Sequence, residues 1–243
     1  MIKTLLKGIL AGIAISLGGW LCLRANAVSL NNIIGSFLFA FGLILIVNFD
    51  FYLYTGRICY LYENKDSKKW LHLLIGLLGN LIGCVIMGVF MRLCFKDSLD
   101  RLFLNLDVMI KNKLTDTWYS VAIKSFLCGM LVYLAVEGFK KIENNLGKYV
   151  VLVLCIGGFV FAGFEHCVAN MFYYALASSY TFKTLLVLLL CIVFNSIGGL
   201  FIPSINLLIK RFENKWFFNK ELSIWKVFSL KNNISIYFEK KCD

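Results

Sequence analysis

Three polar side chains interrupt a long apolar run in the second half of the chain. Glu165, His166 and Asn170 bring a carboxylate, an imidazole and a carboxamide into the segment Phe164–Phe172. A bilayer penalises such groups by a few kcal/mol each unless protein or water satisfies them. These residues are therefore either paired and structural, or they line a path for a polar solute.

The composition assigns the chain to a membrane. Of its 243 residues, 60% are hydrophobic and the mean hydropathy is +0.77, whereas soluble domains are only about 45–50% apolar. Apolar runs occur at about 4–23, 28–49, 70–95, 118–139, 149–164 and 184–209. Because a helix needs about 20 apolar residues to cross the hydrocarbon core, the sequence predicts an all-α integral membrane protein with six transmembrane helices.

The basic residues predict an orientation. The formal net charge is +11, and in so apolar a chain this excess indicates topology and contact with anionic lipid, not a nucleic-acid partner. With the N-terminus inside, the inner segments carry 16 Lys and Arg residues and the outer segments carry 7. The sequence therefore predicts a multi-pass protein of the inner (plasma) membrane. Both termini lie in the cytoplasm, and residues 211–243 form a basic, aromatic cytoplasmic tail.

Signatures of enzymes and metal sites do not occur in the sequence. The nine cysteines show no CxxC or zinc-like spacing, and there are only two histidines. There is also no phosphate-binding loop, dinucleotide fingerprint or HExxH motif. We therefore expect no metal, no cofactor and no enzymatic activity, with the cysteines serving as small packing residues.

The two halves of the chain, about 1–100 and 101–210, repeat one pattern. The aligned segments are Leu6–Gly12 with Ile123–Gly129 at a shift of 117, and Phe49–Thr55 with Phe164–Asn170 at a shift of 115. The shift of 115 also places Asn80 on Asn195. Two separate segments with nearly one register predict an internal structural repeat.

An odd number of spans in each half reverses the direction of the second half across the membrane. The prediction is an inverted 3+3 repeat whose second and fifth helices are broken, because Asn48/Asp50 and Glu165/His166 interrupt two apolar runs. In this alignment Asp50 is the partner of Glu165, and Thr55 is the partner of Asn170.

Several motifs resemble the formate/nitrite transporter family. Gly163–Phe172 is similar to its most characteristic motif, Leu131–Val136 to its fourth-helix motif and Asn195–Gly199 to its sixth-helix motif. Lys3–Gly18 is similar to its first helix, and the whole resemblance covers about 3–210. It implies an aquaporin-like, six-helix channel domain over 1–210 and assembly into homopentamers with one pore in each protomer. The implied substrates are small monovalent anions of weak acids (formate, nitrite or hydrosulfide), carried in some members with a proton.

The resemblance also implies roles for individual residues. The implied pore residues are His166, Thr55, Asn195 and Lys113, with Asn170 added as the repeat partner of Thr55. The implied constriction residues are Phe39 and Leu43 in a cytoplasmic slit, Leu53 on the broken-helix loop and Phe159 in an outer slit. Each of these residues has a structural or packing reading as well, which the sequence leaves open.

Two acids and two tyrosines need separate readings. A negative charge facing an anion path would oppose transport, so we expect Glu165 and Asp50 to support the broken-helix loops by accepting backbone N–H groups. Tyr52 and Tyr54 depart from the family pattern and predict a narrower loop, which favours hydrosulfide. Gly129 stands where the family has an asparagine in its fourth helix. Because of these departures, the sequence also allows a non-conducting family member that acts as a membrane binding or regulatory protein.

Overall fold

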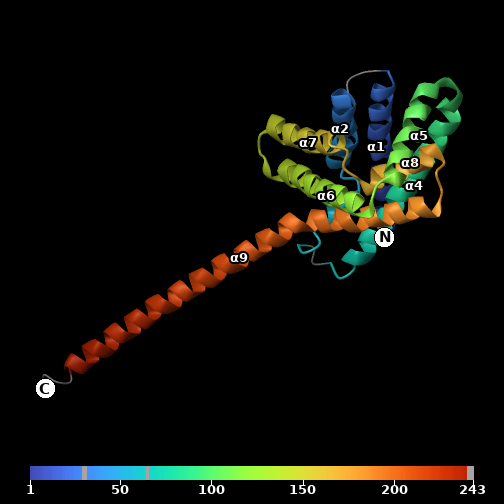
Figure 1. Ribbon diagram of the computed structural model, residues 1–243. Coiled ribbons are helices and arrows are strands. Elements are labelled where there is room, and N and C mark those ends of the chain that lie inside the picture. Colours follow the sequence, from blue (N-terminus) through green and yellow to red (C-terminus); the bar gives the residue numbers. More distant parts are fainter. Residues whose placement is uncertain (29–31, 64–65, 240–243) are drawn as a thin grey trace. The chain divides into compact units, whose positions relative to one another are not determined.

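The computed structural model describes residues 1–28, 32–63 and 66–239, with side chains described as far as residue 213. Every regular element in these ranges is helical (Figure 1). The elements are α1 (Ile2–Ala27), α2 (Asn32–Asn48), α3 (Tyr54–Ile58), α4 (Lys69–Phe95), η1 (Lys96–Ser98), α5 (Asp100–Thr115), α6 (Trp118–Lys141), α7 (Asn145–Phe161), α8 (Cys167–Ala177) and α9 (Phe182–Glu239). The all-helical prediction is confirmed.

The chain forms two compact units. The first, Met1–Ile202, contains α1 to α8 and the beginning of α9, and the second, Pro203–Asp243, contains the remainder of α9. Within the first unit α1 packs on α2 and α4, α2 packs on α7, and α6 packs on α7. The predicted division between channel domain and tail, at 210/211, remains a prediction.

Among the residues that the structure describes, four helical segments are long and apolar enough to cross a membrane. They are Ile2–Ala27, Lys69–Ser98, Trp118–Lys141 and Phe182–Glu213, and three shorter apolar helices are α2, α7 and α8. α8 is the most enclosed of these, since every residue from Cys167 to Leu176 is buried. It packs against α4, α1 and α5, so the polar residues at its N-terminus lie inside the unit.

Two of the apolar helices are broken, as the sequence predicts. α2 ends at Asn48 and the chain becomes helical again at Tyr54, while α7 ends at Phe161 and α8 begins at Cys167. Each break contains one residue with positive φ, Asp50 at 52° and Gly163 at 70°. Glycine suits this left-handed region and aspartate tolerates it.

Two asparagines brace the breaks in the same way. The side-chain oxygen of Asn80 accepts the backbone N–H of Tyr54 at 2.9 Å, and its amide donates to the carbonyls of Gly8 (2.9 Å) and Tyr52 (2.8 Å). The oxygen of Asn195 accepts the N–H of Cys167 at 2.8 Å, and its amide donates to the carbonyls of Ser125 (2.7 Å) and Glu165 (2.8 Å). The groups of Tyr52, Tyr54, Glu165 and Cys167 lie at the breaks, where a broken helix leaves backbone groups without partners. The carbonyls of Gly8 and Ser125 belong to α1 and α6, so each asparagine also ties its break to a neighbouring helix.

These bonds correct the register of the repeat at the breaks. The pairs Tyr54 with Cys167 and Asp50 with Gly163 each differ by 113 residues, whereas the asparagines differ by 115. The pairing of Asp50 with Glu165 is therefore wrong by two residues, and so is that of Thr55 with Asn170. The reason is that the chain between the restarted helix and the bracing asparagine is two residues longer in the second half. In the corrected register Leu53 is the partner of His166.

Gly129 allows α6 and α9 to approach closely. A Cβ atom on Gly129 would lie within 3 Å of the backbone carbonyl group of Asn195 and the backbone nitrogen of Gly199. Gly12 in α1 meets the backbone of Asn80 in α4 in the same manner. The residue that departs from the family pattern thus serves close helix packing.

We expect Gly129→Ala to destabilise the protein, because its methyl group would push α6 away from α9. Overpacking of this kind costs about 1–3 kcal/mol. The matched control is Gly158→Ala, since a Cβ atom there has no neighbour within 4 Å. Thermal unfolding of purified protein in detergent should show a lower midpoint for Gly129→Ala only. Equal midpoints for the two variants would contradict the predicted contact.

Candidate functional site

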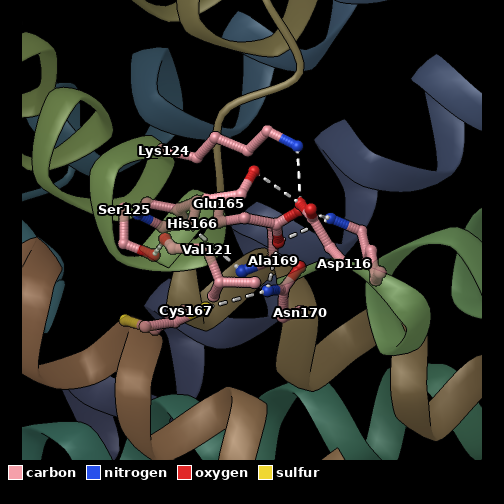
Figure 2. Close-up of polar contacts among 12 residues, drawn as sticks. Asp116, Val121, Lys124, Ser125, Glu165, His166, Cys167, Ala169 and Asn170 are labelled. Atoms are coloured by element: carbon pink, nitrogen blue, oxygen red, sulfur yellow. Dashed lines mark hydrogen bonds and ion pairs between the residues drawn. The ribbon is translucent and has the colours of Figure 1, made fainter. Parts of the chain in front are cut away.

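His166 caps the N-terminus of α8, and its ring contacts Thr55 in α3, the short helix that follows the first break. Its Nδ1 accepts the backbone N–H of Ala169 at 3.2 Å (Figure 2), and its Nε2 lies 3.0 Å from the hydroxyl oxygen of Thr55. Because Nδ1 accepts a hydrogen bond, the neutral imidazole carries its proton on Nε2 and donates it to Thr55. The fold therefore fixes one tautomer of a buried histidine.

Two aromatic rings cover this pair. Phe159 in α7 stacks on the ring of His166, with centroids 5.7 Å apart and an interplanar angle of 25°. Phe39 in α2 meets Phe159 edge to face at 5.8 Å and 75°. Both phenylalanines are buried. The imidazole of His166 therefore packs against an apolar ring on one face, while its Nε2 bonds to the hydroxyl of Thr55.

Two hollows lie near the His166–Thr55 pair, one lined by His166 and the other lined by Leu53 and Gly56, which lie on either side of Thr55 in the sequence. The larger, about 890 Å³, is lined by Phe39, Phe159, His166 and the polar residues near them. The smaller, about 170 Å³, is lined by Leu43, Leu53 and several polar residues. The two share no lining residue among those described.

The constriction residues therefore group differently from the expectation. Phe39 and Leu43 were expected to form one slit, yet Phe39 faces the larger hollow with Phe159, and Leu43 faces the smaller one with Leu53. Phe39 and Leu43 are four residues apart, so they lie on the same face of α2, one turn from each other. These two side chains, together with Leu53 and Phe159, are called the closure below. All four side chains are buried.

The polar residues beside His166 form a neutralised cluster. The ammonium of Lys113, on α5, lies 2.8 and 2.7 Å from the two carboxylate oxygens of Glu165, and the amide of Asn170 donates to Glu165 at 2.7 Å. Figure 2 shows Glu165 and Asn170 side by side at the start of α8. Glu165 thus binds side chains, where backbone N–H groups were expected, and Lys113 reaches the larger hollow already paired.

A second ion pair, which the sequence reading missed, lies on the same hollow. Asp116, in the connection between α5 and α6, accepts hydrogen bonds from Lys124 (2.6 Å), the hydroxyl of Ser120 (3.0 Å) and the N–H of Thr117 (2.9 Å). Burial raises the pKa of Asp116, but these bonds outweigh it and hold the pKa below the ordinary value. The spacing of four residues between Asp116, Ser120 and Lys124, at the start of an apolar run, is a signal that could have revealed this ion pair.

The contacts of Asn195 and Asp50 differ from those that their predicted roles require. All the polar groups of Asn195 are engaged with backbone, and it lines neither hollow, so the geometry favours a supporting role over the predicted pore contact. Asp50 is not buried: its side chain is 67% exposed and pairs with Lys7 and Arg57. Its support acts through these two cations.

The tyrosines do not narrow the larger hollow. The hydroxyl of Tyr54 lies 2.8 Å from that of Ser196 on α9, and the ring of Tyr52 lies against Gly76 on α4. Neither is among the residues around His166. Tyr52 lines a third hollow, of about 320 Å³, and the expectation that the two tyrosines narrow the broken-helix loop and favour hydrosulfide stays a prediction.

The Lys113–Glu165 pair can be tested by a double-mutant cycle. Removing one partner, in Lys113→Met or Glu165→Gln, should cost about 3 kcal/mol of unfolding free energy because the other polar group stays buried. The double variant should cost clearly less than the sum of the two single variants. Denaturant unfolding in detergent measures all four proteins, and strict additivity would show that the pair is not coupled.

Asp116 should make stability depend on pH. Since its folded pKa is depressed, its contribution is present above the unfolded value and is lost as pH falls through the folded pKa, below about pH 4. We expect Asp116→Asn to cost about 1 kcal/mol at neutral pH and to reduce the acid loss. Unfolding midpoints at pH 7 and in acid check this, with the exposed Asp97→Asn as control. An unchanged pH dependence would refute it.

Among the described residues, no three His, Cys, Asp or Glu side chains lie close enough to hold a metal ion. The arrangement offers instead a shielded hydrogen-bond donor between two hollows that small solutes can enter. Such a site can bind and desolvate a small polar species.

Solved structures share this fold. The chain superposes on a protein described as a pentameric formate channel with formate bound, with a TM-score of 0.71 and 24% identity, covering 86% of this chain and 97% of that one. An FNT family ion channel matches with a TM-score of 0.68 and 22% identity, covering 86% and 88%.

Curated relatives and a family model agree. The formate channel FocA of Escherichia coli K12 is 26% identical over 187 residues, which is 70% of this chain, and the match spans 65% of that relative's length. The match to FocA of Haemophilus influenzae, at 28%, spans 59% of this chain and 53% of that relative. A transporter of Bacillus subtilis, YrhG, is 32% identical, with 69% and 68% covered. The apolar helices of the described residues, together with this fold, indicate a multi-pass membrane protein. The family model described as formate/nitrite transporter matches residues 1–210, and the chain belongs to that family.

Proposed function

We propose that the protein conducts small monovalent anions of weak acids (formate, nitrite or hydrosulfide) through one pore in each protomer. The observation that carries this proposal is the buried His166–Thr55 pair, which lies with four buried apolar side chains near two hollows that share no described lining residue. A charged solute cannot cross the closure cheaply, whereas a neutral acid can. The site is therefore suited to conjugate bases of weak acids, which become neutral by taking up one proton.

In the proposed mechanism the anion enters the larger hollow and loses water beside Phe39 and Phe159. Desolvation disfavours its charge, so it takes up a proton and passes the closure as the neutral acid. The Nε2–H of His166 donates a hydrogen bond to the solute in exchange for Thr55. Because Nδ1 holds the N–H of Ala169, forming an imidazolium would break the cap of α8. The proton therefore comes from hydronium of the bulk solvent, which reaches the hollow and leaves a water molecule behind.

The proposed assembly is a homopentamer of six-span protomers. The matching braces at Asn80 and Asn195 support an inverted repeat within 1–210, and a structural relative described as pentameric supports the oligomer. The bias of basic residues supports cytoplasmic termini and a cytoplasmic tail over 211–243 in the plasma membrane. The partners are thus the anion with its proton, the lipid and further copies of the chain.

A second candidate is a non-conducting membrane binding or regulatory protein. The observation that favours it is that the two hollows share no described lining residue and that the apolar side chains near them are buried. Flux separates the two candidates, because a closed family member passes no anion in either direction.

The conduction test uses the full chain in liposomes. Wild type should pass formate, nitrite or hydrosulfide, and His166→Asn should lower the flux about tenfold, which corresponds to about 1.4 kcal/mol of barrier. The pH dependence of flux should remain, because in this mechanism the solute takes its proton from solvent and not from the imidazole. His72→Asn is the matched control, since His72 bonds to Thr4 and lines none of the described hollows around the pore. Absence of flux in wild type would favour the second candidate, and an unchanged His166→Asn would remove histidine from the mechanism.

A further inference from the structure

Two hollows on the Leu43–Leu53 side of the closure meet at a charged neck. The hollow of about 170 Å³ lies against the leucines, and a neighbouring hollow of about 320 Å³ lies beyond it. Three residues line both: Arg57, Tyr60 and Lys140. A solute that moves between the two hollows passes these side chains.

Aromatic rings and hydrogen bonds hold the two cations of the neck. The guanidinium of Arg57 lies over the ring of Tyr52, 5.3 Å from its centroid, and donates to Asp50. The ammonium of Lys140 lies 3.4 Å from the centroid of Tyr60, whose hydroxyl donates to Glu137 at 2.7 Å. The rings fix the cations without neutralising them.

Acidic groups near the neck do not balance its positive charge. The single carboxylate of Asp50 accepts from Arg57 and also from Lys7, so one negative charge serves two cations. Glu137 pairs with the neighbouring lysine, Lys141. Glu63 lines the outer hollow together with Lys69. The described side chains around the neck therefore leave an excess of positive charge, in contrast to the larger hollow, where Lys113 and Lys124 each have a carboxylate partner.

We propose that Arg57 and Lys140 form a second anion-binding site that selects planar oxyanions, formate and nitrite, over hydrosulfide. The proposal rests on the proposed function and deepens it. A guanidinium presents parallel N–H donors that match two oxygen atoms of one anion, whereas a single sulfur atom can use only its charge. Lys140 attracts either anion equally as a point charge. The neck would therefore bind an oxyanion immediately before or after the leucine closure.

Arg57→Lys separates geometry from charge. In proteoliposomes containing the full chain, we expect it to lower formate and nitrite flux about fivefold, the loss of about 1 kcal/mol of binding, and to leave hydrosulfide flux near wild type. Lys140→Gln removes one positive charge and leaves the parallel N–H donors of Arg57 unchanged. It should lower all three fluxes alike, by about twofold at low salt, and the difference should disappear at high salt.

Lys141→Gln is the matched control, because Lys141 is adjacent on α6, is highly exposed and lines neither hollow of the neck. An unchanged formate-to-hydrosulfide ratio in Arg57→Lys overturns the proposal, as does an equal loss of both anions. If Arg57→Lys does not assemble, a Lys140→Gln protein with wild-type flux at low salt overturns it instead. Wild type that passes no anion sinks the proposed function itself. If wild type passes the anions and neither the Arg57 nor the Lys140 substitution changes any flux, only the proposed anion-binding site at the neck is refuted.

Discussion

The structure depends on how it satisfies backbone polar groups at two helix breaks inside an apolar unit. A broken helix exposes N–H and C=O groups that hydrocarbon cannot satisfy. Asn80 serves the first break and Asn195 the second. Each side chain accepts the backbone N–H of the first residue of the restarted helix and donates to two backbone carbonyls. His166 adds a cap to α8 through Nδ1. The same bond that stabilises the fold therefore sets the tautomer and direction of the central imidazole.

The two sides of the closure differ in charge. Around the larger hollow, Lys113 pairs with Glu165 and Lys124 with Asp116, so the basic residues contribute little net field. On the other side Asp50 is shared between Lys7 and Arg57, and Lys140 lies over an aromatic ring. A family fold with matching breaks at its centre can thus carry different electrostatics at its two ends. Arg57 and Lys140, on the more positive side, lie outside the motifs that carry the family resemblance.

Much of the fold could be predicted, and less of the site. The breaks near Asn48/Asp50 and Glu165/His166 were visible because polar residues interrupt apolar runs. The exact pairing of the halves was not, since an ungapped alignment cannot show that the second half is two residues longer between Cys167 and Asn195. The sequence places Phe39 and Leu43 on one helix and so in one slit. In the structure Phe39 instead lines the larger hollow together with Phe159. Asp50 resembled a buried acid only because its neighbours are apolar.

The sequence by itself determined residence in a membrane, helical class, family and the presence of an imidazole at a helix break. These follow from composition and from local patterns, which act through neighbours along the chain. Only the tertiary structure decided that Lys113 is held by Glu165, that Asn195 braces backbone, and that Arg57 and Lys140 line a common neck. Such pairings join residues on different helices. They depend on loop length, helix rotation and close packing at glycines, none of which a linear pattern records.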